Sequence, residues 1–146
     1  MSAGYSRKPL AQKLGIRKGD VLAFLNAPRG YASLLGKLPG GAIVTRGLEE
    51  DLDFVQLFAT EKANLEKEFP KLKARLKQGG MIWVSWPKAS SRLPTDLSDA
   101  VVRETGLDNG LVDVKVCAVD ESWSALKFVR RLKDRDVNSH PKTRKS

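Results

Sequence analysis

Three apolar runs of strand length constrain the fold of this chain more than any other feature. They are VLAFLN, DFVQLFAT and MIWVSW, at residues 21–26, 53–60 and 81–86. A half-exposed strand alternates apolar and polar residues, whereas a run without alternation is typical of a strand buried on both faces. The sequence therefore predicts a sheet covered by helices on both sides.

The segments between these runs supply the helices and one shorter strand. The helices we expect are residues 10–16, 31–38, 61–78 and about 96–104, and the short strand is AIVT at 42–45. In residues 61–78 the apolar side chains recur at helical spacing, Pro70 predicts a kink, and Gly79 and Gly80 predict the end. Thr60 is expected to cap this helix, Thr95 or Asp96 to cap the next, and Gly106 to end it.

The last part of the chain predicts an antiparallel hairpin. LVDVKVCAV at 111–119 alternates, with the valines on one face and Lys115 and Cys117 on the other, and ALKFVRR at 125–131 is the last strand. We therefore expect residues 1–131 to form one α/β domain, a three-layer sandwich whose mostly parallel sheet has about six strands. Residues 132–146 have no packable face and predict a basic, disordered tail.

The residue types that several chemistries need are missing or misplaced. The only histidine, His140, lies in the tail, and the only cysteine, Cys117, lies within a strand. These positions argue against a catalytic triad, a zinc site and an internal disulfide. No G-x-x-x-x-G-K-[ST] phosphate loop occurs either. We therefore predict no catalytic and no metal-ligating residues.

Charge and hydropathy bear on location and partners. No apolar run approaches the ~20 residues of a membrane helix, and the first residues, MSAGYSRKPL, carry no apolar signal core. We expect a cytoplasmic protein with no membrane partner. The formal net charge is +9, and the net charges of residues 1–46, 47–129 and 130–146 are +7, −3 and +5. The two basic ends leave nucleic acid open as a partner, although solubility is the simpler explanation.

The order of elements resembles a class I methyltransferase fold that lacks one β-α unit. LGIRKGDVLAFLN resembles the opening helix, turn and first strand, and DFVQLFAT followed by a helix and GGMIWVSWP resembles the fourth and fifth strands. The resemblance implies a Rossmann-like fold whose C-terminal hairpin corresponds to the last two strands.

Four blocks resemble a bacterial family catalogued as the domain of unknown function 3052 family. They are residues 1–16, 26–31, 83–104 and 110–129, and include NAPRGY and WVSWPKASSRLPTDLSDAVVRE. This resemblance implies a bacterial origin and brings no established activity.

NAPRGY, at the first strand-to-helix turn, contains one set of candidate ligand-binding residues, Asn26, Arg29, Gly30 and Tyr31. They suit a small anion. Cofactor-binding α/β proteins have a glycine-rich turn here, whereas this turn has one glycine, and Pro28 lacks an N–H donor. The motif therefore does not support S-adenosylmethionine, and a tight structural turn is the competing interpretation. Arg46, after the next strand, suits a 2′-phosphate and keeps NADP open.

The second set of candidates follows the strand at 81–86 and consists of Ser85, Lys88, Ser90, Ser91 and Arg92. Strand alternation predicts that Trp83 and Trp86 face opposite layers of helices. The loop after Pro87 is predicted at the carboxyl edge of the sheet, where open α/β sheets bind ligands. Core packing with a solvated loop is the alternative.

These observations predict a non-catalytic binding or regulatory module that holds a small anionic or nucleotide-like ligand near residues 26–31 and 85–92. Two alternatives stay open. One is a divergent S-adenosylmethionine-dependent methyltransferase, and the other is a nucleic-acid-associated protein that uses its basic N-terminal segment and tail.

Overall fold

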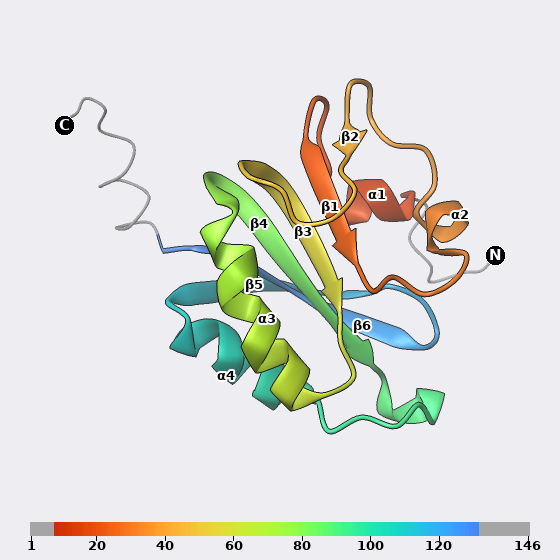
Figure 1. Cartoon of the computed structure of the whole chain (residues 1–146). Helices are drawn as coiled ribbons and strands as arrows, with labels where there is room; N and C mark the ends of the chain where they lie inside the picture. Colours follow the sequence, from red (N-terminus) through yellow and green to blue (C-terminus); the bar gives the residue numbers. More distant parts are fainter. Residues whose placement is uncertain (1–7, 132–146) are drawn as a thin grey trace.

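The computed structural model describes residues 8–131, and its six strands form one mixed sheet (Figure 1). The strands are β1 (Val21–Leu25), β2 (Ile43–Val44), β3 (Leu52–Phe58), β4 (Leu76–Pro87), β5 (Leu111–Ala118) and β6 (Trp123–Arg130). The helices are α1 (Leu10–Lys13), α2 (Tyr31–Leu35), α3 (Lys62–Ala74) and α4 (Asp99–Asp108), with a 3₁₀ turn, η1 (Ala89–Ser91). The predicted tail, its His140 and residues 1–7 lie outside the described residues.

The sheet has the strand order β2-β1-β3-β4-β6-β5. Strand β1 is parallel to β2 and to β3, and β3 is parallel to β4. Strand β6 is antiparallel to β4, and β5 is antiparallel to β6. This order confirms the predicted fold class, a Rossmann-like sheet with a C-terminal hairpin and one β-α unit fewer than a class I methyltransferase.

Two apolar clusters show the three layers. One cluster lies between the sheet and helices α3 and α4, and includes Val55, Leu65, Phe69 and Val102. The other lies between the sheet and helices α1 and α2, and includes Leu14, Leu22 and Leu35. Figure 1 shows these two pairs of helices on opposite sides of the sheet. No helix within residues 8–131 has both the length and the apolar composition that crossing a bilayer requires.

The two tryptophans of β4 lie in different clusters, as alternation predicted. Trp86 packs in the cluster beneath α3 and α4, and Trp83 in the cluster beneath α1 and α2. The Nε1–H of Trp83 donates to the carbonyl of Leu14 at 2.9 Å, so the buried ring keeps a polar partner.

The end of α3 differs from the prediction. The helix runs past Pro70 and ends at Ala74, and β4 begins at Leu76, so Gly79 and Gly80 lie in the strand rather than after the helix. Leu76 pairs with Leu52 of β3, and this strand contact draws the chain into the sheet.

The start of α3 is capped from a distant loop. Thr60 was expected to cap it, but the backbone N–H of Lys62 donates to Oδ1 of Asp96 at 2.7 Å, and Thr95 Oγ1 donates to the Thr60 carbonyl at 2.6 Å. Asp96 and Thr95 therefore tie α3 to the loop before α4 instead of capping α4.

Ser98 caps α4, because its hydroxyl accepts from the backbone N–H of Val101 at 3.3 Å. Gly106 was expected to end this helix but lies inside it. An added Cβ there would lie 2.0 Å from Cε1 of Phe128, so Gly106 is the point of close approach between α4 and β6.

The alternation predicted for β5 is interrupted. The register against β6 shifts between Asp113 and Lys115. On this edge strand Val114 and Val116 are 52% and 55% exposed, while Cys117 is buried. The apolar face of the strand is therefore not the face that the sheet buries.

Candidate functional site

The strand order reverses between β1 and β3. From β1 the chain crosses to β2 on one side, and it then returns to place β3 on the other side. Ligands of open α/β sheets bind in the crevice outside the carboxyl ends of the strands at such a switch point. Here those ends lead into Asn26 after β1 and Ala59 and Thr60 after β3.

A cavity of about 350 Å³ lies at the carboxyl end of β1. Its walls include Phe24, Pro28, Gly30, Tyr31 and Val44, and are mostly apolar. Gly30 precedes α2 with φ +83°, and an added Cβ would meet no atom of residues 8–131 within 4 Å, so this part of the structure leaves the space in front of the turn open. Small-molecule pockets typically enclose about 300–1,000 Å³. The cavity therefore has the volume for a cofactor or part of one.

A second cavity, of about 480 Å³, lies at the carboxyl end of β3. It is lined by Thr60, Glu61, Thr95 and the neighbouring residues of the loop before α4. Glu61 is exposed and brings a carboxylate to this side of the switch point.

A buried hydrogen-bonded chain lies beneath the site. The hydroxyl of Tyr31 donates to Oε1 of Gln56 at 2.5 Å, and Nε2 of Gln56 donates to Oγ of Ser85 at 2.9 Å. Burial raises the pKa of the Tyr31 phenol far above its ordinary value, so the hydroxyl keeps its proton and serves as a donor. Phe24 and Phe58 pack against the Tyr31 ring, with centroids 5.8 and 4.8 Å away.

The Tyr31–Gln56–Ser85 hydrogen bonds join two residues that the sequence suggested as separate ligand contacts. Tyr31 and Ser85 are both buried, and each is bonded to Gln56, so their hydroxyls brace α2 against β3 and β4. Gln56 itself was not predicted. The available signal was a lone amide inside the apolar run DFVQLFAT, since a buried amide requires partners.

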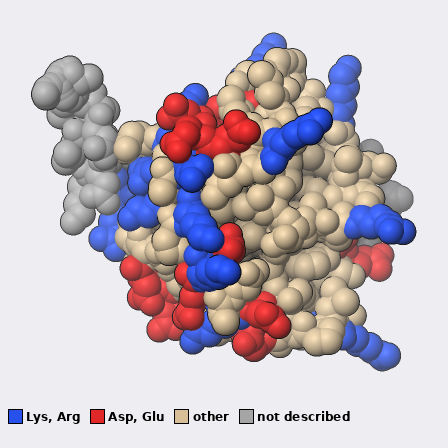
Figure 2. Space-filling model, viewed as in Figure 1, with Lys and Arg blue, Asp and Glu red and all other residues tan. Residues whose placement is uncertain are grey.

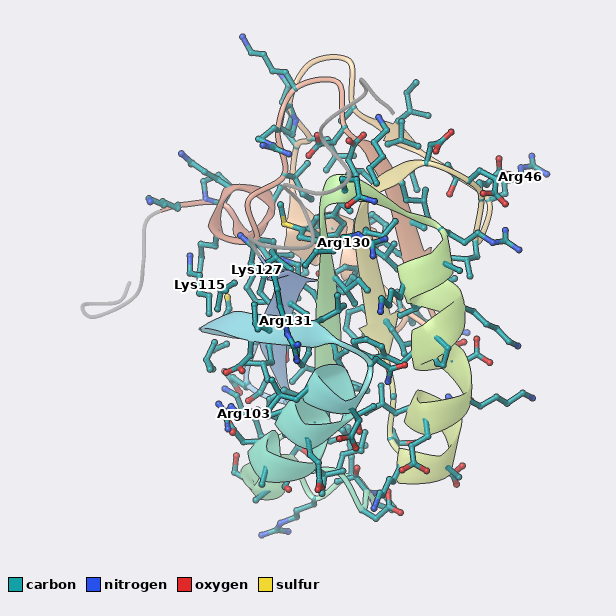
Figure 3. All side chains as sticks on the ribbon, turned by 90° about the vertical axis from the view of Figure 1, so that its left-hand side faces the viewer. Arg46, Arg103, Lys115, Lys127, Arg130 and Arg131 are labelled. Atoms are coloured by element: carbon teal, nitrogen blue, oxygen red, sulfur yellow. The ribbon has the colours of Figure 1, made fainter. Side chains whose placement is uncertain are left out.

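The other candidates of the first turn lie at its surface. Asn26 adopts the left-handed conformation with φ +61°, and Asn26 and Arg29 are both exposed. Arg46, suggested for a 2′-phosphate, is exposed beyond β2, and Figure 3 shows it at the opposite side of the molecule from Lys115 and Lys127.

The loop after β4 forms a compact turn. Ser91 Oγ donates to the carbonyl of Lys88 at 2.7 Å and accepts from the N–H of Leu93 at 3.1 Å. The backbone N–H of Lys88 donates to the Ser122 carbonyl at 2.8 Å, which ties this loop to the β5–β6 hairpin. Ser90 and Arg92 are exposed at its surface, whereas Ser85 is buried below it, so these residues do not form one contact surface.

Solved structures with this fold include S-adenosylmethionine (SAM)-dependent methyltransferases. Magnesium protoporphyrin IX methyltransferase from Synechocystis PCC 6803, with bound SAH, superimposes with TM-score 0.58 and 13% identity, over 84% of this chain and 78% of that one. A SAM-dependent methyltransferase from Aquifex aeolicus gives 0.58 and 13%, over 80% and 85%. Fibrillarin from Aeropyrum pernix, with natively bound SAM, gives 0.56 and 14%, over 82% and 73%. At these identities the likeness establishes the fold.

No family model matches the sequence, and a search of the curated proteins finds no match. The predicted membership of the domain of unknown function 3052 family therefore has no support from these comparisons.

The prediction of a non-catalytic module is wrong. The finding that overturns it is the structural match to a methyltransferase with bound SAH and to fibrillarin with natively bound SAM. That prediction relied on the lack of a triad, a metal cluster and a glycine-rich turn. A reaction whose nucleophile is supplied by the substrate depends on positioning, so the lack of a triad does not argue against an enzyme.

Proposed function

We propose that the chain is a divergent SAM-dependent methyltransferase whose cofactor binds at the switch point between β1 and β3. The observation that carries this proposal is the cavity beside Pro28 and Gly30, which is lined by residues of β1, α2 and β2 and lies at the carboxyl end of β1, next to the switch point. Open α/β sheets bind their ligands in this region. The SAM-bound and SAH-bound structures with the same fold support it.

Residues around the switch point suit the adenine ring, the cationic groups and the amino-acid end of this cofactor. Phe24 and Tyr31 offer aromatic walls to the adenine ring. The exposed carboxylate of Glu61 suits a cationic sulfonium or ammonium group. Because Pro28 withholds a backbone donor from the turn, side chains such as Asn26 would hold the amino-acid end in place of backbone amides.

The chemistry asks for orientation more than for acid–base groups. Bound SAM would supply an electrophilic methyl group to a nucleophilic atom of the acceptor and would leave as SAH, its sulfur keeping the electron pair of the broken bond. The chain contributes a rigid floor, since the Tyr31–Gln56–Ser85 hydrogen bonds fix α2, β3 and β4 relative to one another. Such preorganisation supplies much of the rate when reacting atoms must be aligned.

Thermal unfolding with and without ligand tests cofactor binding. At a SAM concentration ~100-fold above Kd, binding stabilises the native state by about 2.7 kcal/mol. For a domain of this size we expect Tm to rise by roughly 5–11 °C. NADP is the comparison ligand, and SAH formation with candidate acceptors then tests methyl transfer.

Two variants of α2 supply a matched control. Ala32 lines the cavity, whereas Ser33, also exposed on α2, does not. Ala32→Trp fills the mouth of the cavity and should abolish the SAM-dependent rise in Tm, while Ser33→Trp should keep it. If millimolar SAM and SAH both leave the wild-type Tm unchanged, or if only NADP raises it, the proposal is wrong.

A further inference from the structure

The structure brings cations of α1 and the turn after it next to cations of the C-terminal hairpin, which is remote in sequence. Lys13 ends α1, Arg17 follows in the next turn, and Lys115 and Lys127 lie opposite each other on β5 and β6. The Nζ of Lys115 lies 3.4 Å from the Lys13 carbonyl, across 102 residues of sequence. We call these four residues the hairpin basic surface, and Figure 3 shows Lys115 and Lys127 side by side next to α1.

This surface has little neutralising charge within residues 8–131. Lys13, Lys115 and Lys127 have no carboxylate within ion-pair distance there, and Arg17 pairs with Asp20 only at 3.9 Å. On α3, by contrast, Lys62 and Lys71 lie 4.0 and 3.7 Å from Glu66 and Glu68. Figure 2 shows the α3 side of the molecule with blue and red side chains interspersed.

The arrangement opposes the stability of the hairpin. Like charges directly opposite each other on neighbouring strands are destabilising. Burial, together with the charges of Lys115 and Arg17, lowers the pKa of the Lys127 ammonium. A bound anion would relieve this repulsion.

The surface is also hollowed. A cavity of about 330 Å³ is lined by Lys8, Gln12, Lys13, Lys115 and Cys117, and none of the described residues that line it carries a carboxylate. Cys117 belongs to the same apolar cluster as Tyr31, so this cavity and the cavity at Gly30 lie on the same face of the sheet.

We infer that the hairpin basic surface binds the phosphate backbone of a nucleic acid. An extended polyanion matches cations spread over α1 and both hairpin strands better than a single small anion does. The cations of this surface lie on α1, on the turn that follows it and on both strands of the hairpin, so they extend over several elements. More phosphate contacts are therefore available to a long ligand than to a short one.

This binding does not depend on SAM. If the proposed function holds, nucleic acid becomes the candidate methyl acceptor, and that step alone rests on the proposed function.

Fluorescence anisotropy with the full chain, without SAM, tests the inference. The probes are single-stranded RNA and double-stranded DNA of about 20 nucleotides or base pairs, titrated over a range of salt concentrations. Lys13→Gln/Lys115→Gln/Lys127→Gln removes three surface charges, and Lys62→Gln/Lys67→Gln/Lys71→Gln on α3 removes the same number. Both variants have the same formal charge, three below the wild-type +9.

We expect the first variant to bind single-stranded RNA about a hundredfold more weakly at low salt, with a log K against log salt slope shallower by about 2. The α3 variant should keep most of the affinity and the slope. Removing charges that repel one another should leave the fold intact. Lys127→Met keeps an apolar side chain at this position and is the second variant, which removes a single surface charge.

Equal losses from both variants would show an effect of net charge alone and would overturn the inference, as would undetectable binding of both probes at low salt. Displacement of the probe by inorganic phosphate at constant ionic strength would assign the surface to a small anion and overturn it too. A preference for RNA or for DNA supports it and identifies the source of the phosphates.

Discussion

Replacing Gln56 by leucine should destabilise the protein far more than its single amide suggests. Gln56 is fully buried, and it is the partner of both the Tyr31 hydroxyl and the Ser85 hydroxyl. The leucine would leave two buried polar groups without this partner, and each orphaned group costs about 1–3 kcal/mol. The apolar leucine recovers part of this loss, so we expect the free energy of unfolding to fall by about 2–4 kcal/mol.

The variant Tyr31→Phe/Gln56→Leu/Ser85→Ala separates the polar term from packing. It removes all three hydrogen-bonding side chains, so no hydroxyl is left without a partner. Replacing all partners by apolar groups of similar shape is nearly neutral for stability. We expect its free energy of unfolding to lie within about 1 kcal/mol of wild type, well above that of Gln56→Leu.

Urea unfolding followed by tryptophan fluorescence measures both, because Trp83 and Trp86 are buried. Gln12→Leu, at an exposed position of α1, is the control and should change stability by less than about 0.5 kcal/mol. A loss below about 1 kcal/mol in Gln56→Leu, or a triple variant as unstable as the single one, would refute the reasoning.

Two further predictions concern packing and pH. Gly106→Ala should lower the free energy of unfolding by about 1–3 kcal/mol in urea titrations, because the new Cβ meets the Phe128 ring. Gly79→Ala is the control and should be near neutral, because no described residue has an atom within 4 Å of the added Cβ. Equal effects of the two substitutions would contradict the contact with Phe128. Lys127→Met should raise Tm at neutral pH, because burial, and after it the charges of Lys115 and Arg17, lower the pKa of Lys127 in the folded state and disfavour its charge. A folded-state pKa below that of the unfolded chain means that wild-type stability rises with pH between the two values, so the Tm advantage of Lys127→Met should shrink as pH rises toward 10.5. A constant advantage across this range would show that the charge is not its cause.

Apolar periodicity predicted the layers of this protein because the pattern of apolar residues within a segment shows which of its faces is buried. The run that contains Trp83 and Trp86 had to lie between two apolar layers, and the structure places one ring in each. The apolar face that Leu65, Phe69 and Leu72 form predicted a helix packed against the sheet. Helix α3 buries all three side chains.

Local signals misplaced the ends of the elements wherever a distant residue supplied the partner. Asp96 accepts from the first turn of α3 across 34 residues, so no local cap was needed at Thr60. Gly106 was expected to end α4, but it serves the contact with Phe128. A glycine in the sequence can end a helix or allow a close contact with another element. Which of the two roles it has depends on the element that packs against it.

The sequence alone determined that a sheet would be buried between helices, since that follows from which side chains avoid water. Tertiary structure decided the strand order, and with it the cavity beside Gly30, the link of Tyr31 to Ser85 through Gln56, and the meeting of Lys13 with Lys115. Each of these joins segments far apart in the chain. Their contacts depend on how strands pair and register, and hydrophobic periodicity within one segment carries no information about its partner.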